Sequence, residues 1–79
     1  MDNLREKIKN IMEEIFNTSL KNTKDEDIKE GNIENWDSLN HVNLMMRLEQ
    51  EFNVKFSLDE IEKARDLKTI VDIILSKTS

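Results

Sequence analysis

The sequence predicts an all-α protein, a small four-helix bundle with three longer helices and one short third helix. Apolar residues recur at helical spacing in several runs, and no segment shows the sustained alternation of a β-strand. The chain has no Pro and one Gly, so little interrupts these runs. Its 79 residues suffice for one core and not for two, so we expect a single domain over residues 1–79.

The first helix is expected over residues 4–16. Its apolar residues repeat at intervals of three and four, with charged residues on the opposite side. Asp2 or Asn3 could cap its start, because both side chains accept hydrogen bonds from the first amides of a helix. The apolar positions are Leu4, Ile8, Ile11, Met12, Ile15 and Phe16.

Residues 17–37 are polar and lack periodicity, which predicts a long loop. Three lysines stand against six acids in this segment, a net charge of −3. A loop of about 20 residues is unusual in a small domain and is often functional. We expect Ile28, Ile33 and Trp36 to attach it to the core, and Gly31 to supply a turn.

The second helix is expected over residues 39–52. On a helical wheel, most of its apolar residues gather on one side as a core stripe. His41 lies near the centre of this stripe, where we expect a buried, hydrogen-bonded histidine. The predicted core residues are Val42, Leu44, Met45, Leu48 and Phe52.

Leu39 and Met46 fall on a different face of this helix, together with Asn43 and Gln50. Two apolar side chains on an otherwise polar face are not required by the fold. They are therefore candidates for a docking surface.

Two shorter segments complete the prediction. Ser57 and Glu60 match a capping box and open a short helix over residues 58–64, with Ile61 facing inward. Asp66 is then expected to cap the last helix, and residues 76–79 are expected to fray. The apolar residues of that helix are Leu67, Ile70, Val71, Ile73, Ile74 and Leu75.

Composition excludes several functions. With 12 basic and 17 acidic residues the net charge is −5, which argues against nucleic acid and anionic membranes and favours partners with basic patches. The absence of Cys excludes disulfides and thiolate metal sites and fits a reducing compartment. The chain shows neither a membrane-spanning stretch nor a secretory signal, so we expect a cytoplasmic monomer.

Neither catalysis nor metal binding is expected. Ser38 and His41 could face each other on one helix, but a hydrolase also needs an orienting acid and an oxyanion hole. A calcium loop beginning at Asp25 would need an oxygen ligand and a glycine where Lys29 and Glu30 stand. One His with scattered carboxylates forms no recognised zinc set.

Ser38 allows two interpretations. Ser and Asp are both favoured at helix starts, so Asp37 or Ser38 could simply be a cap. A hydroxyl at a helix N-terminus also lies where amides and the helix dipole favour a phosphate group. Ser38 begins the longest amphipathic helix, follows an acidic loop and precedes the outward-facing Leu39, which favours a point of covalent attachment.

In Asp37-Ser38-Leu39 and the pattern that follows, the chain resembles acyl carrier proteins and peptidyl carrier domains over almost its whole length. The resemblance implies a four-helix bundle in which a phosphopantetheinyl transferase joins 4′-phosphopantetheine from coenzyme A to Ser38. The arm would carry an acyl or aminoacyl group as a thioester between a loading ligase and a downstream synthase or transferase. The residues that match the pattern of the family's second helix are Val42, Leu44, Met45, Leu48, Glu49, Glu51 and Phe52. Phe56, Ile61 and the closing helix from Leu67 to Ile74 fit the remainder of the family pattern. The expected docking residues are Leu39, Asn43, Met46, Arg47 and Glu49.

One departure from the family bears on the pathway in which such a carrier would act. Carriers of fatty-acid synthesis place several acids after the serine, where this chain has Asn40, Asn43 and Arg47. With Trp36 before the motif and His41 after it, the chain resembles stand-alone carriers of polyketide, peptide or surface-polysaccharide assembly more than carriers of fatty-acid synthesis. The alternative is a non-catalytic helical interaction module in which Ser38 is only a cap.

Overall fold

The computed structural model describes residues 3–78, and it confirms the all-α fold. Within these residues the only strand-like pairing is one isolated bridge between Lys29 and Asp66. No helix among them is long and apolar enough to span a membrane. The helices are α1 (Asn3–Phe16), the short 3-10 helix η1 (Asp25–Asp27), α2 (Ser38–Phe52), α3 (Leu58–Lys63) and α4 (Leu67–Thr78).

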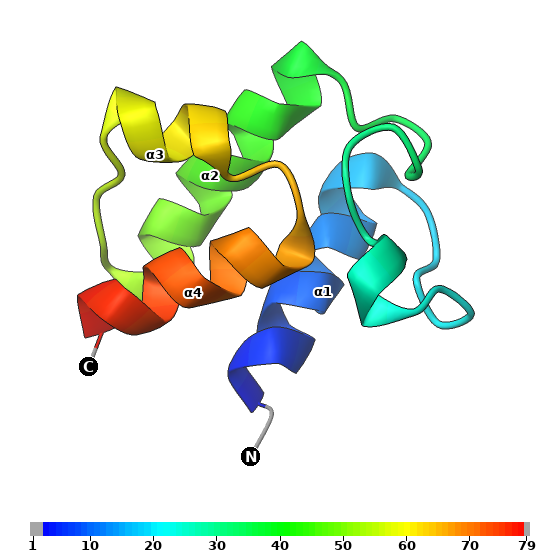
Figure 1. The fold of residues 1–79 in the computed structure, drawn as a ribbon, viewed down its shortest axis with the longest axis horizontal. Coiled ribbons are helices and arrows are strands. Elements are labelled where there is room, and N and C mark those ends of the chain that lie inside the picture. The colour runs from blue at the N-terminus through cyan, green and yellow to red at the C-terminus, as the bar shows by residue number, and fades with distance from the viewer. Residues whose placement is uncertain (1–2, 79) are drawn as a thin grey trace.

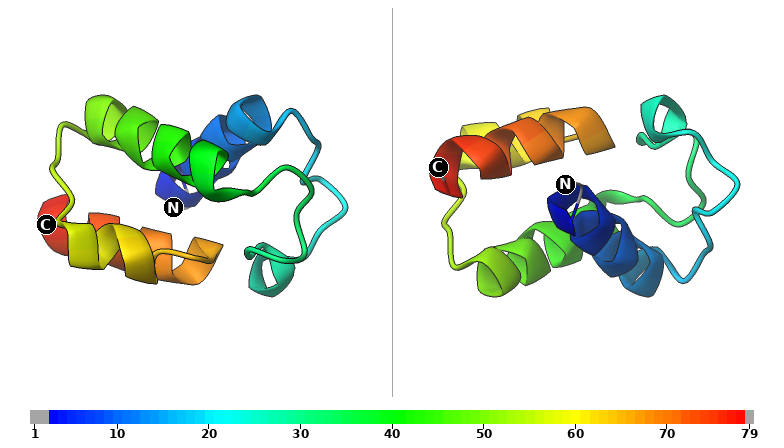
Figure 2. Two further views of the ribbon diagram at one scale, coloured as in Figure 1. Left: turned by 90° about the horizontal axis from the view of Figure 1, so that it is seen from above. Right: turned by 90° about the horizontal axis from the view of Figure 1, so that it is seen from below.

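The helices enclose one hydrophobic core. Helices α1 and α2 lie on one side of the bundle and α3 and α4 on the other (Figure 2). Helix α1 packs against α2 and α4, and the long loop closes the end of the bundle at which α2 begins (Figure 1). The fully buried large side chains are Phe16, Ile8, Met12, Leu20, Ile28, Leu44, Met45, Leu48, Leu67, Ile70 and Ile74.

Asparagines end the two longest helices. Asn17 follows α1 with φ 53° and Asn53 follows α2 with φ 55°, both in the left-handed region. Asn adopts this conformation more readily than most residues, so it can take the place of the usual glycine. Gly31, with φ 100°, supplies the expected turn in the loop.

The predicted start of α4 is confirmed and its predicted end is wrong. Asp66 caps the helix, its Oδ1 accepting from the amide of Thr69 at 2.8 Å. Residues 76–78 continue the helix instead of fraying, and the Thr78 hydroxyl donates to the carbonyl of Ile74 at 2.9 Å. Asp2, one of the two caps expected for α1, and Ser79 lie outside the described residues; Asn3 is the first residue of α1.

The long loop is ordered by its contacts with the core. Ile28, Ile33 and Trp36 are buried as predicted. Leu20 is buried as well, although its polar surroundings in the sequence do not predict this. Two backbone hydrogen bonds of 2.9 Å then join the loop to the junction between α3 and α4: the amide of Leu67 donates to the carbonyl of Ile28, and the amide of Glu30 donates to the carbonyl of Arg65. This loop therefore holds the start of α2 in a defined place.

An ion cluster attaches η1 to α1. The Asp25 carboxylate accepts from Lys9 at 2.9 Å and from Arg5 at 3.0 Å. The hydrogen bond from Lys9, and then the one from Arg5, holds the pKa of Asp25 below its usual value. The same bond to Asp25 raises the pKa of Lys9.

Asp25→Asn should therefore reduce stability only when the carboxylate is ionised. A carboxyl group whose pKa is lower in the folded than in the unfolded state stabilises the fold at pH values above its ordinary pKa, about 3.9 for Asp. This stabilisation is lost as the pH falls through the pKa of the folded state. The side chain is 37 % exposed, so we expect a loss of about 1 kcal/mol or less at pH 7 and a smaller loss at pH 3. Urea unfolding at both pH values measures it, with the neighbouring exposed acid as control in Glu26→Gln. An equal loss at both pH values would contradict the ionic explanation.

Candidate functional site

Ser38 is the first residue of α2, and Asp37, not Ser38, is its cap. The Asp37 side chain accepts from the amide of Asn40 at 2.9 Å, and its carbonyl accepts from the amide of His41 at 2.8 Å. Ser38 itself is exposed. Since the Asp37 side chain already caps the helix, the Ser38 hydroxyl is available for another role.

The surroundings of Ser38 suit a phosphodiester. The first amides of a helix and its dipole favour negative charge at this point. The Asp37 side chain accepts a hydrogen bond only from the amide of Asn40, so the amides of Ser38 and Leu39 remain without a helical partner at the helix start. A phosphate group on the exposed Ser38 oxygen therefore fits this position.

Trp36 and His41 form a buried pair behind Ser38. The Trp36 indole Nε1 donates to His41 Nδ1 at 3.0 Å, so the histidine proton lies on Nε2. That Nε2 donates to the carbonyl of Ile61 in α3 at 2.7 Å. The predicted hydrogen-bonded histidine is thus confirmed, with only 2 % of its surface exposed.

Ser38 and His41 do not form a catalytic pair in this arrangement. Both ring nitrogens of His41 are engaged, one by Trp36 and one by Ile61, so neither faces Ser38 as a general base. Among residues 3–78 no group of three or more His, Asp or Glu side chains is placed to hold a metal ion. His41 is therefore not placed to take a proton from Ser38.

The exposed face of α2 differs from the prediction at one residue. Leu39 and Met46 are 71 % and 54 % exposed, as expected, but Val42 is 48 % exposed and does not belong to the core. Val42 lies at the edge of the predicted core stripe, about 40° from Met46 on the wheel, and the helices leave that edge open. The spacing i, i+3, i+7 from Leu39 could have revealed it. We call Leu39, Val42 and Met46 the α2 stripe.

The other expected docking residues flank this stripe in different ways. Asn43 is exposed, while Arg47 pairs with Glu14 of α1 at 2.8 Å. The Glu49 carboxylate accepts from the backbone amide of Phe56 at 2.8 Å, which orders the turn into α3. Arg47 and Glu49 therefore also have partners within the molecule.

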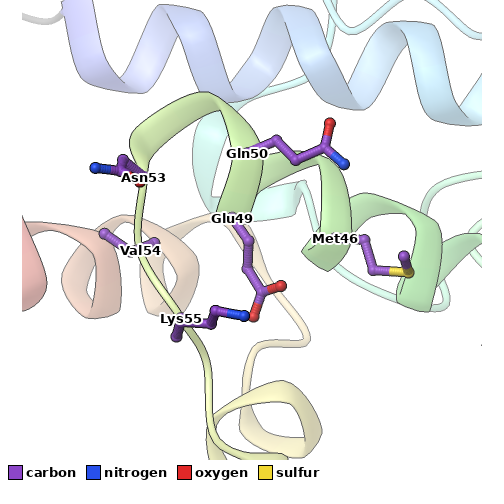
Figure 3. Close-up of a pocket in the computed structure, with 6 residues that line it drawn as sticks. All are labelled: Met46, Glu49, Gln50, Asn53, Val54 and Lys55. Carbon is purple, nitrogen blue, oxygen red and sulfur yellow. The ribbon is translucent and has the colours of Figure 1, made fainter.

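The α2 stripe continues into a surface hollow of ≈ 410 Å³ at the end of α2. Met46 lies at one rim and Val54 at the other, with Glu49 and Gln50 between them (Figure 3). The remaining lining residues are Asn53 and Lys55. This hollow extends the exposed face of α2 beyond the apolar side chains.

Fold and site together define a class of protein: a small helical bundle with an exposed serine at the start of one helix and exposed apolar side chains along that helix. Residues 6–74 match the family model described as "Phosphopantetheine attachment site" (PP-binding). The chain belongs to this family and is a phosphopantetheine-carrying carrier protein, as the resemblance implied. Its cofactor is 4′-phosphopantetheine, which this family attaches covalently. Such carriers are generally non-catalytic and interact with enzymes such as transferases and synthases.

Proposed function

We propose that Ser38 bears the 4′-phosphopantetheine arm and that the chain itself performs no catalysis. The observation that supports this best is the exposed Ser38 hydroxyl at a helix start that Asp37 already caps. The Ser38 oxygen would form a phosphodiester with the phosphopantetheine of coenzyme A, and adenosine 3′,5′-bisphosphate would leave. When attached, the arm supplies a thiol that holds an acyl or aminoacyl group as a thioester.

Intact-mass analysis tests the attachment. The protein is incubated with coenzyme A and a broad-specificity phosphopantetheinyl transferase, and its mass should rise by one phosphopantetheine group. Peptide mapping should place the added mass on Ser38. An unchanged mass would support the alternative, a helical interaction module in which the α2 stripe binds a fixed partner.

We propose that the α2 stripe, flanked by Asn43, Arg47 and Glu49, is the docking face for these enzymes. Its three side chains are exposed beside Ser38 without a role in the core. Small, mostly polar contacts with a few apolar anchors are typical of transient interfaces.

Met46→Asp should therefore raise the KM of the transferase for this carrier by about tenfold, the effect of losing one apolar anchor. Its unfolding free energy should barely change, because Met46 is 54 % exposed. Leu75→Asp is the matched control, since Leu75 is 48 % exposed but lies on α4. Equal KM values for the two variants would contradict docking through α2.

We further propose that the pathway is specialised: polyketide, peptide or surface-polysaccharide assembly. The exposed or half-exposed positions after Ser38 hold Asn40, Asn43 and Arg47, and Glu49 is engaged by a backbone amide. This face offers few free acids to the Arg- and Lys-rich surface of a fatty-acid-synthesis partner. Profiling the acids loaded on the modified protein in its native cells would identify the cargo; ordinary fatty-acid intermediates would contradict this assignment.

The specific partners would be a loading ligase and a downstream synthase or transferase that share this face. The single domain over residues 1–79, the monomeric state and the cytoplasmic location stay predictions. A cytoplasmic location is supported by the absence of cysteine, which fits a reducing compartment.

A further inference from the structure

Two residues just before Ser38 connect three helices. Asn35 has φ 71°, the left-handed conformation, and it directs the chain from the loop towards the start of α2. Asn is one of the few residues other than Gly that adopt this conformation readily. Trp36 follows it and is 5 % exposed.

Asn35 bonds to both neighbouring helices. Its side-chain Nδ2 donates to the carbonyl of Phe16 at 2.8 Å, at the end of α1, where carbonyls lack helical partners. Its own carbonyl accepts from the side chain of Asn40 in the first turn of α2, also at 2.8 Å. One residue thus fixes the end of α1 relative to the start of α2.

Trp36 makes the same connection with its ring. Its ring stacks on Phe16 with 5.0 Å between centroids, and its Nε1 donates to His41 in α2. His41 in turn donates to the carbonyl of Ile61, which extends the connection to α3. These bonds are largely shielded from water and are correspondingly strong.

We propose that Asn35 and Trp36 are positioning residues for arm attachment, an inference that rests on Ser38 being the attachment site. Both residues contact Phe16 at the end of α1, and they also bond to Asn40 and His41 in the first turn of α2. They can therefore fix the position of Ser38 without touching its hydroxyl. They hold the hydroxyl where a docked transferase meets it. A displacement of about 1 Å can cost up to about 100-fold in rate.

The transferase reaction tests this with two variants. Asn35→Asp keeps the size but places a carboxylate against the Phe16 carbonyl, and Trp36→Phe keeps a ring but loses the N–H. Each should lower kcat by about tenfold, with the KM for the carrier unchanged because the α2 stripe is intact. Rates are measured at a temperature where circular dichroism shows every protein fully folded, which removes any effect of stability alone.

Asn32→Asp is the matched control. It introduces the same charge in the same loop, and its side chain also donates to a backbone carbonyl, that of Asp27 at 3.1 Å. It should keep the wild-type kcat. The proposal would be overturned if Asn35→Asp and Trp36→Phe kept the wild-type kcat, or if kcat fell equally in Asn32→Asp. A change confined to KM in the two variants would overturn it as well.

If Asn35→Asp does not fold, Asn35→Gly replaces it, because glycine accepts the left-handed φ and lacks the bonding side chain. The same criteria then apply. Failure of the wild-type protein to become modified at Ser38 would overturn the proposed function and this inference with it. If the wild type is modified at Ser38 and the variants keep its kcat, only the positioning role is overturned.

Discussion

Ser38→Ala is expected to abolish attachment of phosphopantetheine completely while leaving the fold intact. Alanine has no oxygen to form the phosphodiester, so the mass should not rise with coenzyme A and transferase. Stability should change by less than about 0.5 kcal/mol, because Ser38 is exposed and Asp37 supplies the cap. Intact mass and urea unfolding of the same sample measure both effects.

Ser57→Ala provides the reciprocal control. Ser57 is also an exposed serine at a helix start, but its hydroxyl accepts from the amide of Glu60 at 3.1 Å in a complete capping box. Its loss should cost about 1 kcal/mol and leave modification unchanged. Modification of Ser38→Ala would contradict the attachment site. A loss of about 1 kcal/mol in that variant would show that Ser38 has a capping role after all.

Local signals in the sequence were sufficient to predict the helices. Periodicity identified the three longer α-helices and the capping box identified the short α3, and the capping residues Ser57 and Asp66 marked two starts correctly. Helices α1 and α2 end where an asparagine directly succeeds Phe16 and Phe52, since Asn tolerates left-handed φ. These features depend on residues a few positions apart, which a sequence displays directly.

Contacts between distant residues could not be predicted in this way. Lys9 and Asp25 are 16 positions apart, Phe16 and Asn35 are 19 apart, and their pairing depends on how the loop folds back. Leu20 was missed for the same reason, because it lies alone in a polar segment without periodicity. Val42 was misplaced because a wheel gives direction and does not show which neighbour covers each edge.

The site shows the same division between local and distant information. Asp37, Ser38 and Leu39 are adjacent, so the motif and its likeness to carriers were visible in the sequence. The bond from His41 to Ile61 joins residues 20 positions apart, and only the structure reveals that it occupies the nitrogen a catalytic histidine would need. A buried histidine was predictable; its engagement on both sides was not.

Phe16→Ala should bring the protein close to unfolding. Phe16 is fully buried, ends α1 and stacks on Trp36. Replacing such a residue by alanine leaves a cavity and costs about 3–5 kcal/mol. Small domains have few kcal/mol in reserve, so a large part of the population should be unfolded at 37 °C. Urea unfolding followed by circular dichroism measures the loss.

Phe52→Ala is the matched control because Phe52 ends α2 as Phe16 ends α1, and an asparagine with left-handed φ follows each. Phe52 is only half-buried, so the same chemical change removes less packing and leaves a smaller cavity. We expect its cost to be clearly below that of Phe16→Ala. Equal costs would contradict the role of Phe16 as the point where α1, the loop and Trp36 are joined. A large loss confined to Phe16→Ala would show that the support beneath Ser38 is also a main contributor to the stability of the bundle.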